Sequence, residues 1–313
     1  MTPLISVIIP VYNGEKTIIH TLNSVLKQTY LNFEVIIVDD CSDTPVESLI
    51  QPLTKDNRIR IFRKERSNAN TARNYGIRQS KGEYIAMLDA DDYWLENHLH
   101  DCLALLRESD AGGLYGSLYF SKSMPADIHT LPSLSVCQAR ELEEDESMVD
   151  YLLTMGCGAQ TSTLFTTALA MKNIMWNEKL IDHDYDFVVR FHKKYKMIVK
   201  KEPTVVYYLL SGRPIRYETF IWFFEEVIKE INPMVYTRYN LNMYIQAGRK
   251  EESKKFAPHF QKEATRYKEC ISYQQYISIR NPKNRSQEWI EKIKYLWYIT
   301  GIHFKLFAFQ KGT

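Results

Sequence analysis

Three carboxylates follow one short apolar run within four positions. In the stretch GEYIAMLDADDYW, residues 84–88 read as a buried strand, and Asp89, Asp91 and Asp92 come directly after it. Like charges this close repel, and burying them is costly unless a cation neutralises them. Mg²⁺ and Mn²⁺ bind oxygen ligands, commonly one or two carboxylates plus substrate phosphates. The stretch therefore indicates either a metal–phosphate site or a solvated acidic turn.

A second acidic pair, Asp39 and Asp40, closes the predicted strand FEVIIVDD. Such a pair can cap a helix or a turn, although Asp43 and Thr44 could serve there instead. Alternatively, a carboxylate at a strand end accepts a hydrogen bond from a base N–H or a sugar hydroxyl. Arg73, in NTARNYG, is either a surface charge or a cation that contacts a phosphate or orders the aspartates.

The elements that must position these residues alternate along the first hundred positions. Predicted strands cover residues 4–12, 33–40, 58–63 and 83–89, and predicted helices cover residues 15–28, 46–53, 70–80 and 95–109. This alternation predicts βαβ units and a mainly parallel sheet of the α/β class. Ligands bind outside the carboxyl ends of the strands in such sheets, which is where the acidic residues lie.

The rest of the chain carries weaker patterns. We predict a loop over residues 121–146, a helix over residues 183–196 and a strand over residues 204–210. Beyond that strand the pattern is helical to the end, with interruptions at prolines. We therefore predict two domains, a catalytic domain at residues 1–212 and a helical C-terminal region at residues 213–313.

Composition is that of an ordinary globular protein, with 45% apolar residues, 25% charged residues and a net charge of +2. Neither G-x-G-x-x-G after the first strand nor G-x-x-x-x-G-K-[ST] occurs, which argues against a Rossmann dehydrogenase and a P-loop enzyme. The five cysteines form no C-x-x-C pair, so we expect reduced thiols in a cytoplasmic protein. We expect no signal peptide, no membrane-spanning helix and no nucleic-acid partner.

Four blocks of sequence, in this order and spacing, resemble the family 2 glycosyltransferases, inverting enzymes with the GT-A fold. The blocks are ISVIIPVYNG, VIIVDDCSD, ARNYGI and KGEYIAMLDADD. The resemblance runs from Leu4 to Trp94, resumes at IDHDYDFVVRFHKKYKM and covers residues 4–210 in all. It implies a Rossmann-like, mainly parallel sheet flanked by helices, followed by a helical C-terminal extension that carries no family motif.

The resemblance implies a donor pocket for a UDP-sugar. The residues that it assigns to this pocket are Pro10, Val11, Tyr12, Asp40, Arg73, Asp89 and Asp91. In this assignment Tyr12 lies against the uracil, Asp40 meets the uracil N–H, and Arg73 lies beside the pyrophosphate. Asp89 holds the ribose, and Asp91, together with Asp89, ligates Mn²⁺ or Mg²⁺ as the cofactor.

The resemblance also implies a catalytic base. The family usually has Glu-Asp at the start of a helix, with the Asp as the base. Here His183 occupies the Glu position and Asp184 the Asp position. We therefore predict Asp184 as the base, with Asp182 and Asp186 as close alternatives.

Two further positions stay open at this point. Asp92 could replace Asp91 in part, because adjacent aspartates leave the register open by one residue. The Arg that often follows the next strand in the family is absent: Leu209 and Leu210 stand there, with Arg213 close by.

The activity implied is transfer of a hexose or N-acetylhexosamine from a UDP-sugar to a hydroxyl of a glycan acceptor. A lipid-linked acceptor and a role in bacterial surface-polysaccharide biosynthesis are typical of such compact family members. Two other classes remain as alternatives. A metal-dependent nucleotidyltransferase also carries paired aspartates on a parallel sheet, and a glycosyltransferase-like subunit could keep the fold without turnover. The retained Asp40, Asp89, Asp91 and Asp184 argue against the second alternative.

The C-terminal part is basic: residues 249–313 contain 14 Lys or Arg and 6 Asp or Glu. Within it, EWIEKIKYLWYITGIHFKLFAF has apolar residues at helical spacing and aromatic rings suited to a membrane interface. This pattern favours peripheral contact of residues 287–313 with the inner face of the cytoplasmic membrane. The alternatives are a helix packed on the catalytic domain and a homodimer contact.

Overall fold

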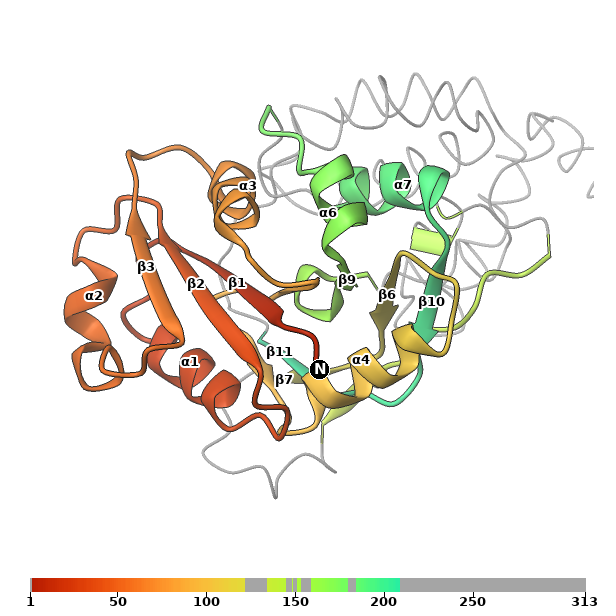
Figure 1. Ribbon diagram of the computed structural model, residues 1–313, viewed down its shortest axis with the longest axis horizontal. Helices are drawn as coiled ribbons and strands as arrows, with labels where there is room; N and C mark the ends of the chain where they lie inside the picture. The colour runs from red at the N-terminus through yellow and green to blue at the C-terminus, as the bar shows by residue number, and fades with distance from the viewer. Residues whose placement is uncertain are drawn as a thin grey trace, which may run out of the picture. The chain divides into compact units, whose positions relative to one another are not determined.

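A computed structural model describes residues 2–121, 134–144, 148, 151–152, 159–179 and 184–208 of the 313-residue chain. These residues form a sheet of seven strands and a second sheet of four (Figure 1). The chain divides into the units Met1–Pro214 and Ile215–Thr313, and every described residue belongs to the first. The predicted boundary after residue 212 and the predicted helical region 213–313 lie outside the described residues and stay predictions.

The larger sheet is mainly parallel, as predicted, with the strand order β10-β6-β9-β4-β1-β2-β3. β9 pairs antiparallel with β4 and with β6, and the other pairs are parallel. β1 and β2 lie inside the sheet and are buried along their whole length, which explains their nearly continuous apolar runs. The strands are β1 (Ile5–Val11), β2 (Phe33–Asp39), β3 (Ile59–Arg63), β4 (Tyr84–Met87), β6 (Gly113–Gly116), β9 (Phe165–Thr167) and β10 (Met197–Lys200).

Helices cover both faces of this sheet (Figure 1). On one side lie α1 (Ile18–Leu26) and α4 (His98–Arg107), and on the other lie α3 (Ala69–Gln79), α6 (Ala168–Ile174) and α7 (Asp184–Lys194). α3 approaches the sheet closely because Gly76 faces β1: a Cβ at Gly76 would come within 2.5 Å of Ile8 Cγ2. A larger residue at this position would push the helix away from the strands.

One predicted helix differs in the structure. Residues 46–53 form α2 (Val46–Leu49) followed by a separate 3₁₀ turn at Gln51–Leu53, in place of one continuous helix. Pro52 explains the break, because proline has no backbone N–H to donate to the carbonyl of the preceding helical turn.

The smaller sheet is absent from the sequence prediction, although the strand predicted over residues 204–210 is confirmed at Val205–Tyr208 as one of its members. Its strand order is β5-β11-β7-β8, with β5 (Tyr93–Trp94), β7 (Leu118–Ser121), β8 (Ser135–Cys137) and β11 (Val205–Tyr208). The predicted loop over residues 121–146 is therefore wrong at β8, a strand too short to show a period. The expectation of reduced thiols is also wrong at Cys137, which is disulfide-bonded. Folding brings cysteines together that their spacing in the sequence does not connect.

The topology brings the candidate site residues to one edge of the larger sheet. β1 lies between β2 and β4 and runs parallel to both, with Val11 opposite Asp39 and Ile8 opposite Met87. The residues that follow these strands therefore leave the sheet side by side. Among the described residues, no helix is both long and apolar enough to cross a membrane. The segment 287–313, predicted to contact a membrane, lies outside them.

Candidate active site

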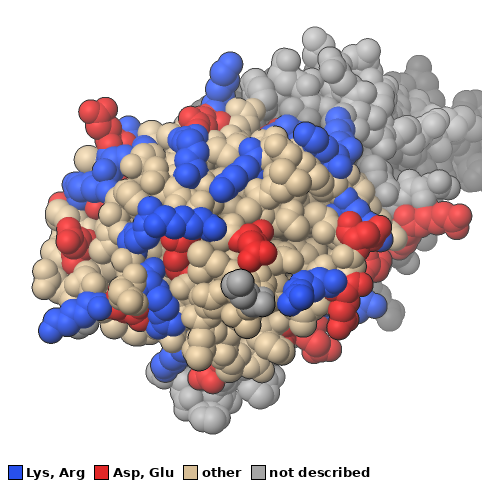
Figure 2. Space-filling model, in the orientation of Figure 1, with Lys and Arg blue, Asp and Glu red and all other residues tan. Residues whose placement is uncertain are grey.

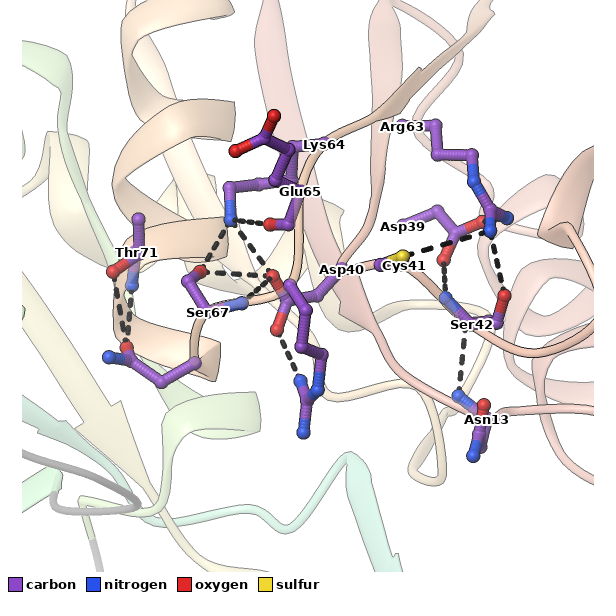
Figure 3. A network of polar contacts seen from close by, with 12 residues as sticks. Asn13, Asp39, Asp40, Cys41, Ser42, Arg63, Lys64, Glu65, Ser67 and Thr71 are labelled. Atoms are coloured by element: carbon purple, nitrogen blue, oxygen red, sulfur yellow. Dashed lines mark hydrogen bonds and ion pairs between the residues drawn. The ribbon is translucent and has the colours of Figure 1, made fainter.

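Asp39, the first of the two carboxylates at the end of β2, shapes the adjoining loop. It is buried and accepts a hydrogen bond from the backbone N–H of Ser42 at 2.8 Å (Figure 3). It also accepts from the backbone N–H of Val46 at 3.2 Å. Its carboxylate also forms an ion pair with Arg63 at 2.8 Å. These contacts hold the turn after β2 and the first residue of α2. Asp39 therefore holds the turn, as the structural alternative for this pair predicted, although the N-cap residue of α2 is Pro45.

Asp40, the second carboxylate, is buried beside an exposed aromatic ring. One of its oxygens accepts from Lys64 Nζ (2.9 Å) and from the backbone N–H and hydroxyl of Ser67 (both 3.0 Å) (Figure 3). The other oxygen accepts from the guanidinium of Arg66. The same guanidinium lies over the Tyr12 ring, 3.4 Å from its centroid. Asp40 and Tyr12, the two residues predicted to bind the base, thus lie together.

The loops after β1 and β2 are bound to each other. The Asn13 N–H donates to Ser42 Oγ (3.0 Å), and Asn13 and Asp43 exchange two further hydrogen bonds (3.0 and 2.9 Å). Asn13 and the exposed Cys41 have positive φ angles of 50° and 64°. Asparagine adopts this left-handed backbone readily, whereas at Cys41 it is unfavourable and the surrounding contacts must hold it. Pro10 and Val11 are buried in β1 behind these loops.

Arg73, on α3, is a buried cation that connects two candidate acids. One of its terminal nitrogens donates to Asp89 at 2.8 Å. The other donates to Asn70 Oδ1 at 2.9 Å and lies 4.0 Å from the Asp184 carboxylate. The Arg73 side chain is only 6% exposed, so the surface-charge interpretation is wrong. Arg73 instead orders Asp89 and Asp184, which come from distant parts of the chain.

α3 also fixes the segment that leads toward α7. Two of its asparagines and its N-cap residue Asn68 donate side-chain N–H groups to consecutive backbone carbonyls: Asn74 to Trp176 (2.8 Å), Asn70 to Asn177 (3.0 Å) and Asn68 to Glu178 (3.0 Å). The Trp176 ring stacks on Phe187 of α7, with centroids 3.8 Å apart and planes 8° apart. Our sequence reasoning missed these residues. Asn70 and Asn74, spaced i and i+4 around Arg73, were the signal available in NTARNYG.

The end of β4 contains one acid that faces inward and two that do not. Asp92 is buried and accepts from the Ser162 hydroxyl and from the Tyr208 backbone N–H (3.2 Å). Burial, with the neighbouring Asp91 and Asp89 carboxylates, raises the pKa of Asp92 well above its ordinary value. Both oxygens of Asp92 are thus engaged inside the protein, so this geometry does not favour the alternative of Asp92 as a metal ligand. Sequence analysis gave no signal for Ser162.

Asp89 and Asp91 remain at the edge of the sheet. The Asp89 backbone N–H donates to Ser162 Oγ (3.0 Å), and its side chain is 24% exposed. Asp91 is half-buried on the turn that follows. The described residues contain no group of three or more His, Cys, Asp or Glu placed to hold a metal. Two carboxylates nevertheless fit a cation that takes its other ligands from substrate phosphates and water.

Asp184 begins α7 as described, and its side chain is 20% exposed. The Thr161 backbone N–H donates to it at 3.4 Å. Burial raises the pKa of the Asp184 carboxyl; Arg73 opposes this rise and the Asp89 charge adds to it. A carboxylate with a raised pKa is the stronger base.

Of the two alternative bases, Asp186 is held by Arg190, whose guanidinium donates to it at 2.9 and 2.7 Å. Arg190 also donates to the backbone carbonyls of Ile174 and Met175, so this pair ties α7 to the end of α6. The other alternative, Asp182, lies outside the described residues, as do His183, Leu209, Leu210 and Arg213.

Residues 6–171 match the family model "Glycosyl transferase family 2". The chain is also 31% identical, over 229 residues, to the amylovoran biosynthesis glycosyltransferase AmsB of Erwinia amylovora. That alignment covers 69% of this chain and 75% of AmsB. The chain belongs to glycosyl transferase family 2.

Solved structures place this family 2 chain in the GT-A fold. S. aureus TarS, residues 1–349 in complex with UDP-GlcNAc, aligns with a TM-score of 0.64 at 17% identity, covering 96% of this chain and 93% of that one. The mannosyltransferase PcManGT from Pyrobaculum calidifontis, in complex with GDP-Man and Mn²⁺, aligns with a TM-score of 0.58 at 15% identity, covering 95% and 88%. At these identities the likeness concerns the fold alone.

Proposed function

We propose that this family 2 glycosyltransferase is an inverting, metal-dependent enzyme. It moves a hexose or N-acetylhexosamine from a UDP-sugar to a hydroxyl of a glycan acceptor. The observation that carries the proposal is the shared guanidinium of Arg73, 2.8 Å from Asp89 and 4.0 Å from Asp184. The buried Arg73 thereby holds Asp89, at the proposed donor site, close to Asp184, which can accept a proton from the acceptor hydroxyl.

At the donor end, Tyr12 stacks on the uracil, Asp40 accepts its N–H, and Asp89 holds the ribose. Asp89 and Asp91 would hold a divalent cation, which when bound would supply positive charge for the diphosphate leaving group. Arg73 is a second positive group on this side, because its guanidinium lies against Asp89. The TarS complex with UDP-GlcNAc supports the nucleotide, and the PcManGT complex supports the metal.

At the acceptor end, Asp184 is the general base. It takes the proton of the attacking hydroxyl as the new oxygen–carbon bond forms at the anomeric carbon. The bond from that carbon to the diphosphate oxygen breaks on the opposite face, and UDP leaves. Attack from behind converts an α-linked donor into a β-linked product. The raised pKa of Asp184 suits this role, because a carboxylate with a raised pKa takes up a proton more readily than an ordinary one.

Further parts of the proposal concern the setting. The likeness to AmsB supports polysaccharide biosynthesis. A lipid-linked acceptor, a cytoplasmic enzyme at the inner membrane face and a homodimer are proposals that the described residues do not test. Sedimentation of the full chain with anionic liposomes, with and without residues 287–313, checks the membrane contact. Light scattering checks the dimer.

The test of the function is a panel of UDP-sugars and GDP-sugars, each with and without glycan acceptors. We expect UDP release that requires both an acceptor and Mn²⁺ or Mg²⁺, and a β-linkage in the product by NMR. Release of pyrophosphate with a nucleotidyl product would instead identify a nucleotidyltransferase. Nucleotide binding without release for any donor and acceptor would identify a non-catalytic subunit.

A further inference from the structure

Arg66 makes both of the contacts that the proposed nucleobase needs. It lies in the turn between β3 and α3, with its guanidinium carbon 3.4 Å from the centroid of the Tyr12 ring. The same guanidinium donates to one oxygen of Asp40. The planar guanidinium of Arg66 reaches Tyr12 and Asp40 at the same time. The face of the Tyr12 ring that it covers is therefore the face next to this Asp40 oxygen.

A guanidinium and a uracil ring present similar chemistry to such a site. Both are planar, both stack on an aromatic face, and both offer an N–H donor in their own plane. A uracil that stacked on this face of Tyr12 and donated to this oxygen of Asp40 would need the position that Arg66 occupies. The two groups are therefore alternatives at one place.

We propose that Arg66 is an internal ligand of the nucleobase position, and that it must leave Tyr12 and Asp40 before the base of the donor can bind. The inference rests on the proposed function, because it takes Tyr12 and Asp40 as the base site. Arg66 thus sets donor affinity: the apparent affinity falls by the fraction of molecules in which the position is already filled.

The surroundings allow Arg66 to move without opening the core. Its side chain is 48% exposed, whereas the Asp40 side chain is 2% exposed. When Arg66 leaves, the other Asp40 oxygen keeps Lys64 at 2.9 Å and Ser67 at 3.0 Å. The buried carboxylate thus stays neutralised. Lys64 also donates to the Glu65 carbonyl (2.8 Å) and to the Ser67 hydroxyl, so it is the fixed cation and Arg66 the movable one.

The first experiment measures uridine binding to the full chain and to Arg66→Ala by ligand-observed NMR titration. Uridine is the probe because it carries the base without the charged phosphates. We expect the variant to bind uridine about fivefold more tightly, which corresponds to Arg66 filling the position in about four of five molecules. Arg107→Ala, which removes the same charge from an exposed position on α4, is the matched control and should leave uridine binding unchanged.

The second experiment varies salt. Figure 2 shows Lys and Arg interspersed with Asp and Glu on the face that it presents, so no single-sign patch dominates there. Raising NaCl from about 0.05 to about 0.5 M screens the exposed Arg66 side of its ion pair with Asp40. Uridine binding to the wild-type chain should therefore tighten with salt, while binding to Arg66→Ala stays flat. A merely structural role for Arg66 gives no such difference.

The results separate this inference from the proposed donor. If UDP binds both proteins but Arg66→Ala binds uridine equally well or more weakly, the Arg66 proposal is overturned and the UDP-sugar donor stands. If neither protein binds UDP or uridine, the proposed donor fails, and the Arg66 proposal fails with it. Tighter uridine binding by Arg66→Ala, together with the loss of salt dependence, supports both.

Discussion

The two acidic strand ends of this molecule look alike in sequence and differ in how their charge is balanced. At the end of β2, Asp39 contacts Arg63, and Asp40 contacts both Lys64 and Arg66. At the end of β4, one guanidinium, that of Arg73, lies against both Asp89 and Asp184. The first end is neutralised by the chain's own cations. The second shares one cation between two acids, which favours an additional cation from solution.

The comparison teaches that a pair of aspartates at a strand end does not by itself identify a metal site. The β2 pair and the β4 acids both follow buried strands at the same edge of the sheet. What separates them is the number of cations that neighbouring elements bring into contact.

Asp91→Ala should abolish sugar transfer. In the variant, UDP binding should no longer depend on Mn²⁺ or Mg²⁺. The reason is that the turn after β4 is the proposed metal site, and a half-buried turn residue contributes little to folding. Calorimetric titration of UDP with and without metal measures the effect, and circular dichroism checks the fold. If EDTA leaves both UDP affinity and activity of the wild-type chain unchanged, the metal role of Asp89 and Asp91 is wrong.

Asp184→Asn should lower turnover by about 10²–10⁴-fold while UDP-sugar binding is kept, because asparagine is nearly isosteric but accepts no proton. The matched control is Asp186→Asn on the same helix. Since Asp186 is bound to Arg190, this control should keep most activity and lose about 1 kcal/mol of unfolding free energy. Steady-state kinetics and urea unfolding measure both. Near wild-type turnover in Asp184→Asn would move the base to another residue.

Asp39→Ala should lower the free energy of unfolding by about 2 kcal/mol, because the buried backbone N–H of Ser42 loses its acceptor. UDP affinity should change little, since Asp39 faces the loop and not the Tyr12 ring. Chemical denaturation and UDP titration give the two numbers. If Asp39→Ala lowered UDP affinity as much as Asp40→Ala does, the two aspartates after β2 would both contribute to UDP binding. The distinction between a structural Asp39 and a ligand-binding Asp40 would then be wrong.

The smallest expected effect concerns a titrating group away from both acidic ends. His98 is buried, stacks on Trp94 and contacts the Thr204 hydroxyl at 2.8 Å. Burial, with a smaller contribution from Lys200, holds the pKa of His98 well below its usual 6.5. Between that depressed pKa and 6.5 the unfolded chain binds a proton that the folded chain does not. The stability contributed by neutral His98 is therefore complete above pH 6.5 and is lost as pH falls.

His98→Phe keeps the ring and removes this titration. The unfolding free energy of the variant should be less steep against pH below 6.5, by at most about 1.4 kcal/mol per pH unit. Unfolding in urea across that range measures the slope. Identical slopes in the two proteins would show that His98 does not carry the effect. In the His98→Phe variant, the pH dependence of turnover can be measured without this change in stability, which helps to assign the titration of Asp184.

Much of the larger sheet could be predicted from the sequence, because β1 to β4 are buried runs separated by amphipathic helices. The same pattern correctly brought Tyr12, Asp40 and Asp89 to one edge. The pairing of the smaller sheet and three of its strands could not be predicted, since those strands are two to four residues long and pair across distant segments; only β11 was predicted. Nor could the inward direction of Asp92, which depends on Ser162 and on Tyr208 of β11.

Arg66 shows a further limit of sequence reasoning. Its neighbours RKERS suggest only a charged turn, and nothing in the spacing connects this residue to Tyr12 or Asp40. The contact exists because the turn after β3 comes back toward the ends of β1 and β2 when the sheet forms. Contacts made by long exposed side chains follow from the fold and leave no periodic signature.

Asn68, Asn70 and Asn74 bind the backbone of residues 176–178 through its carbonyl oxygens. A contact to a backbone carbonyl does not depend on the side chain of the residue that carries the carbonyl. Glu178 is held by its side chain as well, because its carboxylate accepts from Asn74 at 2.8 Å and lies 3.6 Å from Arg78. Asn177 can therefore change more freely than Glu178 while its carbonyl still binds Asn70, which contacts Arg73 beside the proposed base Asp184. Library selection for altered acceptors should begin at Asn177.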